Sequence, residues 1–160
     1  KMLFPGIRLG WMVAPAMVIE RLAAAKQAAD LSTSLLFQAA MVRFAEGRML
    51  NRHASTVQAE YRRRRDALLK SLQAEMPAGV TWTRPAGGFS LVVRLPAGID
   101  SGHILSRAAE KGVLYTAGRV FSLSGDSRLL RLSFGSTKTE LIPEGIKRLA
   151  SVVKEELARA

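Results

Sequence analysis

Apolar and polar residues follow regular patterns along most of the chain, beginning close to its first residue. From residue 7 to residue 13 every second residue is apolar, which predicts a β-strand. Pro15 can occupy the first turn of a helix that follows this strand, because proline is tolerated there. A second helix is predicted over residues 34–45, ending at Gly47.

The central part of the chain changes from a helical to a strand pattern. Residues 50–74 carry apolar side chains at helical spacing with charged residues between them, which predicts one long helix. Two strand-like runs follow, VTWTRP at 80–85 and FSLVVRL at 89–95, and the short segment AGG separates them. The second run alternates regularly, so we expect one of its faces to be buried.

The last sixty residues contain both kinds of pattern. A helix is predicted over residues 101–111, and Gly112 suits a left-handed cap at its C-terminal end. A short strand is predicted in GVLYTAG and a longer one in LLRLSF at 129–134. A final helix is predicted with Pro143 in or near its first turn.

These patterns predict an α/β chain with an α+β arrangement, in which a small sheet packs against helices. The residues after about position 46 contain all the elements of a complete small domain. The residues before it resemble the end of a larger domain. The predicted boundary lies near Gly47, so that residues 1–46 form the remnant of a large domain and residues 47–160 the small domain.

The composition is that of a globular protein, with 48% hydrophobic and 23% charged residues in a chain of 160. The chain contains no cysteine, which excludes disulfides, thiolate metal sites and cysteine nucleophiles. No apolar run approaches the roughly 18 residues that a membrane span requires. We therefore expect a soluble, cytoplasmic protein without a membrane partner.

The charge is strongly basic, with 24 Lys and Arg against 13 Asp and Glu, a formal net charge of +11. An excess of basic over acidic residues is a feature of proteins that bind nucleic acid. The arginines at 62–65 would surround a helix turn rather than form one flat face, so a solvated helix is the preferred interpretation. A free-standing nucleic-acid module therefore rests on charge alone, and acids in a missing part of the protein would offset that charge.

Lys1 and Arg8 flank the turn-forming segment PGI. Together they could hold a phosphorylated ligand, and a lysine can also form an imine with a carbonyl. From spacing alone, two solvated surface charges are the simpler interpretation. His53 and His103 stand apart from each other and from acidic clusters, so no metal site is predicted.

The run KMLFPGIRLGWMVAP resembles the segment that carries the Schiff-base lysine in fold-type I pyridoxal-phosphate enzymes. The similar branch includes 2-aminoadipate aminotransferase and the aminotransferase-like domains of MocR-type regulators. Further segments agree with this branch in order and spacing, and they cover nearly the whole chain: YRRRRDALLKSL, RPAGGFSLVVRLP, GVLYTAGRVF, LLRLSFG and EGIKRLA. The resemblance implies that the chain is the C-terminal part of an aminotransferase, beginning on its catalytic lysine.

The resemblance also implies roles for three residues. Lys1 would form the imine with pyridoxal 5'-phosphate and move a proton at the substrate α-carbon, while Arg8 would bind the cofactor phosphate. Arg131 would hold the substrate α-carboxylate by a two-pronged salt bridge, and the alternation in LLRLSF independently turns it away from the core. Arg94, Arg119 and Arg128 match no functional residue and are expected at the surface, although Arg119 could approach the site.

The implied reaction transfers an amino group between an amino acid and a 2-oxo acid. The family also implies a homodimer, and little activity is expected of a chain that lacks most of the cofactor pocket. The alternative is the effector-sensing domain of a MocR/GntR-type transcriptional regulator, in which a winged helix-turn-helix domain upstream would bind DNA.

Overall fold

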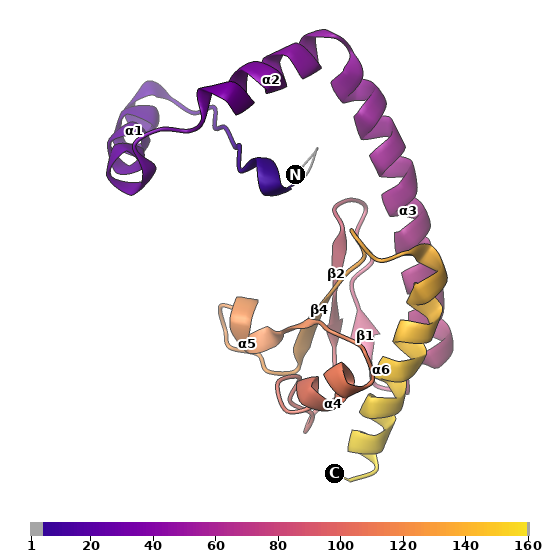
Figure 1. Ribbon diagram of the computed structural model, residues 1–160. Coiled ribbons are helices and arrows are strands. Elements are labelled where there is room, and N and C mark those ends of the chain that lie inside the picture. The colour runs from indigo at the N-terminus through magenta and orange to yellow at the C-terminus, as the bar shows by residue number, and fades with distance from the viewer. Residues whose placement is uncertain (1–4, 160) are drawn as a thin grey trace. The chain divides into compact units, whose positions relative to one another are not determined.

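The computed structural model describes residues 5–159 (Figure 1). The chain divides into two compact units, residues 1–58 and 59–160, which are described separately. The division falls inside the long helix α3 (Met49–Glu75). The bounds of this helix are close to the predicted 50–74. No helix among the described residues combines the length and the apolar composition needed to cross a bilayer.

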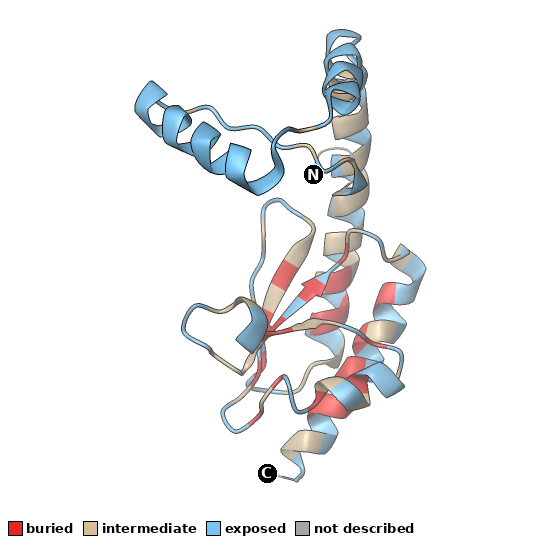
Figure 2. Ribbon diagram, turned by 60° about the vertical axis from the view of Figure 1, so that its left-hand side comes forward, coloured by how far each residue is buried: buried red, intermediate tan, exposed pale blue. Residues whose placement is uncertain are grey.

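The first unit consists of helices without a core. It contains a 3₁₀ turn, η1 (Pro5–Ile7), two helices, α1 (Ala16–Asp30) and α2 (Leu35–Glu46), and the beginning of α3. None of the residues from 6 to 58 is buried, as the absence of red in this part of Figure 2 shows. Its exposed side chains include several large apolar ones, such as Trp11, Met17 and Leu35.

The strand predicted over residues 7–13 is wrong. Residues 8–15 are irregular, and Trp11 and Val13 are 74% and 92% exposed. A strand needs a neighbouring strand to accept and donate its backbone hydrogen bonds, and residues 5–58 contain none. Pro15 also lies one residue earlier than expected, at the N-cap of α1 rather than within its first turn.

The second unit contains one antiparallel sheet with the strand order β1-β2-β4-β3. Its strands are β1 (Thr81–Trp82), β2 (Ser90–Arg94), β3 (Thr116–Ala117) and β4 (Leu129–Ser133). The remaining elements are the helices α4 (Leu105–Glu110), α5 (Gly118–Phe121) and α6 (Ile142–Leu157), and the 3₁₀ turn η2 (Thr139–Leu141). The predicted small sheet packed with helices is confirmed.

The core lies between one face of the sheet and the helices α3, α4 and α6. Leu130 and Leu132 of β4 point into it, while Arg131 between them is exposed, as alternation along a strand requires. Helix α6 buries one side, because its apolar residues recur at helical spacing. Each fully buried leucine or isoleucine contributes about 1.5–3 kcal/mol relative to an exposed one.

Helix α4 is shorter than predicted, but its C-terminal end is as expected. Residues 101–104 form turns, and the Asp100 side chain accepts a hydrogen bond of 2.7 Å from the backbone N–H of Gly102. Gly112 has a φ of +75°, and its N–H donates to Ala109 while the next N–H donates to Ala108. This pair of bonds satisfies the last carbonyl groups of the helix.

We predict that residues 47–160 fold by themselves and that residues 1–46 do not. The longer segment keeps α3 whole and contains every buried residue of the described chain, whereas the shorter one buries none. Cooperative urea unfolding, followed by circular dichroism, is expected only for the longer segment. Cooperative unfolding of residues 1–46 would show that this segment has a core of its own.

Candidate functional site

The sheet face opposite α3, α4 and α6 carries mainly polar side chains. Alternation along the four strands places these residues on the same face: Thr81, Ser90, Arg94, Thr116, Arg131 and Ser133. All of them are exposed or half-buried. This open face therefore presents hydrogen-bonding groups and positive charge to a ligand.

Arg131 occupies a central place on the open face. It pairs with Val92 of β2 on one side and with Thr116 of β3 on the other. Its Nη2 donates a hydrogen bond of 3.2 Å to Thr116 Oγ1, and its Cζ lies 5.8 Å from the centre of the Phe121 ring. Within residues 5–159 no carboxylate forms an ion pair with Arg131. Most of its five N–H donors are thus available to an anion.

Three neighbouring arginines are engaged by aspartates. Arg94 and Arg128 both pair with Asp126, and Arg119 pairs with Asp100 at 2.7 Å. The hydrogen bond from Arg128 holds the pKa of Asp126 below its ordinary value, and the hydrogen bond from Arg119 does the same for the pKa of Asp100. These arginines lie at the surface and each is paired with a carboxylate, although Arg94 and Arg128 share one, whereas Arg131 is paired with none.

The four arginines at 62–65 have two different environments. Arg64 donates to Glu60 at 2.7 Å and to the backbone carbonyl of Gly135, and Arg65 donates to the carbonyl of Pro85 at 3.2 Å. Their side chains are only 18% and 23% exposed. The expectation of solvated side chains therefore holds for Arg62 and Arg63 but is wrong for Arg64 and Arg65. Successive residues of a helix point in different directions, so neighbours in sequence have different surroundings.

The two other predicted site residues belong to the first unit. Lys1 lies outside the described residues. Arg8 is exposed and has a left-handed φ of +51°, and its side chain makes no hydrogen bond or ion pair with a described residue. The roles of Lys1 and Arg8, like that of Arg131, stay predictions.

The family model for aminotransferase class I and II matches residues 1–149. The chain belongs to this family. The resemblance inferred from the sequence is thereby confirmed.

Three relatives, two aminotransferases and one transcriptional regulator, show how far the similarity to known proteins extends. The aromatic-amino-acid aminotransferase 1 of Thermococcus litoralis is 42% identical over 99% of this chain and 38% of its own length. The α-aminoadipate aminotransferase of Thermus thermophilus, solved in complex with N-(5'-phosphopyridoxyl)-L-leucine, is 34% identical with a TM-score of 0.92, covering 100% of this chain and 41% of the other. The helix-turn-helix-type regulator YdfD of Bacillus subtilis is 30% identical over 99% of this chain and 33% of its own.

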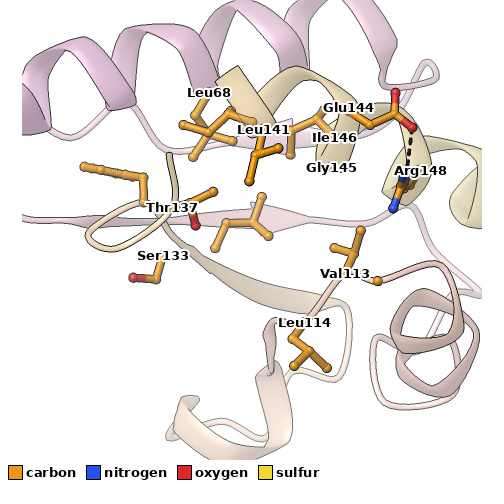
Figure 3. A pocket seen from close by; sticks show the side chains of 14 residues that line it. Leu68, Val113, Leu114, Ser133, Thr137, Leu141, Glu144, Gly145, Ile146 and Arg148 are labelled. Atoms are coloured by element: carbon orange, nitrogen blue, oxygen red, sulfur yellow. Dashed lines mark hydrogen bonds and ion pairs between the residues drawn. The ribbon is translucent and has the colours of Figure 1, made fainter. Parts of the chain in front are cut away.

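The chain also contains a mainly apolar pocket of about 300 Å³ (Figure 3). It opens where the segment before β3 diverges from the end of β4, and among its lining residues are Leu68, Val113, Leu114, Phe134, Leu141 and Ile146. Arg148 at this pocket donates to Glu144 at 2.8 Å and to the carbonyl of Lys111 at 3.2 Å. Arg131 does not line the pocket, so the uncompensated cation and the apolar pocket are separate features.

Thr116 and Phe121 are neighbours of Arg131 that the sequence did not reveal. Thr116 was part of a predicted strand, but its contact with Arg131 depends on the register between β3 and β4. Phe121 ends a one-turn helix that the apolar pattern did not predict. Among residues 5–159 no group of three or more His, Asp or Glu side chains is placed to hold a metal ion.

Proposed function

We propose that the chain is the C-terminal part of a pyridoxal-phosphate-dependent aminotransferase, which transfers an amino group between an amino acid and a 2-oxo acid. The chain spans about 40% of the length of the aminotransferases cited above. Family membership supports the reaction class, and the observation that carries the proposal is the uncompensated charge of Arg131 on the open face of the sheet.

In this proposal Arg131 binds the α-carboxylate of the substrate. Its planar fork matches the two oxygens of a carboxylate, and its charge persists at every physiological pH. A lysine would provide charge without the fork. The neighbours that are already paired with aspartates, Arg94, Arg119 and Arg128, would compete poorly for the same carboxylate.

The described residues agree in chemistry with pyridoxal 5'-phosphate as cofactor. Arg8 is an exposed cation without a described partner, as a phosphate ligand requires. Lys1 would hold the cofactor covalently and would remove and return the proton at the substrate α-carbon. When bound, the cofactor supplies an electron sink for the carbanion, and the protein supplies position and charge.

Borohydride reduction tests the assignment of Lys1. In the complete subunit, reduction followed by peptide mapping is expected to place a pyridoxyl group on Lys1. A label on Lys26 or Lys70 instead would contradict the family alignment. As a control, the 160-residue chain alone is expected to bind the cofactor only weakly, because it spans about 40% of the length of the aminotransferases cited above.

We also propose a cytoplasmic homodimer for the complete protein. The first unit exposes many large apolar side chains and buries none of its described residues. Other protein surface is therefore expected to cover this unit. Folded proteins rarely leave so much apolar surface to water. Size-exclusion chromatography with light scattering on the complete protein tests this assembly, and a monomeric mass would contradict it.

A second candidate function is the effector-sensing domain of a transcriptional regulator. The similarity to YdfD favours it, because it covers 99% of this chain. Both functions would use Lys1, and they differ in the rest of the protein. A winged helix-turn-helix domain in the complete open reading frame, with salt-dependent DNA binding, would support the regulator.

A further inference from the structure

Resting on the proposed function, we infer that Thr116 and Phe121 are positioning residues, which hold the guanidinium of Arg131 ready for a carboxylate. The inference depends on geometry on the open face. Thr116 Oγ1 accepts one Arg131 N–H at 3.2 Å, and the Phe121 ring lies 5.8 Å from Cζ. Neither contact brings a negative charge to Arg131, whereas each neighbouring arginine is paired with an aspartate.

The two contacts act on different degrees of freedom of the Arg131 side chain. The hydroxyl of Thr116 accepts from one end of the fork and limits its rotation. The ring of Phe121 offers its π-electrons to the cation from one side of the guanidinium. An exposed arginine otherwise loses rotamer freedom when it binds a ligand, so holding it beforehand strengthens binding.

The fold fixes the place of Phe121 itself. Strand β3 runs directly into α5, whose first residue, Gly118, approaches the backbone of residues 126 and 129 so closely that a side chain would not fit. The N–H of Gly118 also donates to Ser101 Oγ, which belongs to a fully buried serine. Because this short helix has little freedom, the ring at its last residue keeps its position beside Arg131.

Substitutions at residue 121 test the inference in the complete subunit with its cofactor bound. Phe121→Leu is expected to lower kcat/KM for α-amino acids about 5-fold to 30-fold, because it removes the ring but keeps an apolar side chain. Phe121→Tyr, which keeps an aromatic ring, should retain most of the kcat/KM of the unchanged protein. Val120→Ala is the matched control, since Val120 lies on the same turn and is 77% exposed, and it should change kcat/KM less than 2-fold.

Substitutions at residue 116 test the hydroxyl. Thr116→Val keeps the shape of the side chain but removes the acceptor, and should lower kcat/KM about 3-fold to 10-fold. Thr116→Ser should recover most of the activity. Direct titration with propionate gives a readout independent of turnover, and its Kd should rise in Phe121→Leu and in Thr116→Val.

A double-mutant cycle separates failure of this inference from failure of the proposed function. In an Arg131→Ala background, Phe121→Leu should have no further effect on kcat/KM, and amines without a carboxylate should be indifferent to every substitution. If Arg131→Ala impairs turnover but Phe121→Leu and Thr116→Val do not, the positioning role is overturned. If Arg131→Ala itself has no effect on kcat/KM, the proposed role of Arg131 is contradicted, and the positioning role of Thr116 and Phe121 is contradicted with it. Retention of the cofactor absorbance in each variant verifies that it is folded.

Discussion

Replacing Arg131 with alanine in the complete subunit is expected to lower kcat/KM for α-amino acids about 30-fold to 1000-fold, corresponding to about 2–4 kcal/mol. The variant loses a charge-assisted, two-pronged contact with the substrate carboxylate. The cofactor should stay bound, because its phosphate is held elsewhere, by Arg8 in our proposal. Steady-state kinetics and cofactor absorbance, measured on the same preparation, check both parts.

The controls use residues of the same type. Arg131→Lys should recover only part of the activity, since an ammonium keeps the charge but not the fork. Arg119→Ala removes an arginine that is 68% exposed and already paired with Asp100, so kcat/KM should change less than 3-fold. Unchanged kcat/KM in Arg131→Ala together with a large loss in Arg119→Ala would transfer the carboxylate-binding role to Arg119.

The second large effect is expected on stability. Gly118→Ala should lower the free energy of unfolding of the 160-residue chain by about 2–4 kcal/mol. A Cβ at this position would lie 2.2 Å from the carbonyl oxygen of Asp126 and 2.7 Å from that of Leu129. Both are backbone atoms, which cannot move aside as a flexible side chain can. The midpoint of urea unfolding measures the change.

Gly145 provides the matched control for this substitution. It lies within α6, and a Cβ there would meet no atom within 4 Å. Gly145→Ala should therefore raise the free energy of unfolding by about 0.5–1 kcal/mol, because alanine favours a helix more than glycine does. Equal midpoints for Gly118→Ala and the unchanged chain would show that α5 can move away from β4, and would weaken the argument that it fixes Phe121.

Local pattern was sufficient for several elements of the second unit. The long helix, the alternating strands β2 and β4 and the amphipathic α6 were all predicted, because in each the apolar period matches the period of the element. The exposure of Arg131 followed from the same alternation. The strand predicted over residues 7–13 is absent for the converse reason, since an alternating pattern cannot supply the neighbouring strand that a strand requires.

By itself, the sequence determined the fold class, the family and the presence of an arginine facing away from the core. These follow from periodicity and from ordered motifs, which are local properties of the chain. Only the tertiary structure decided which arginines near Arg131 are paired with aspartates, because ion pairs such as Arg119 with Asp100 join residues that are distant in sequence. The same holds for Thr116 and Phe121 beside Arg131, whose proximity depends on strand register and on the close approach of Gly118 to the strand next to it.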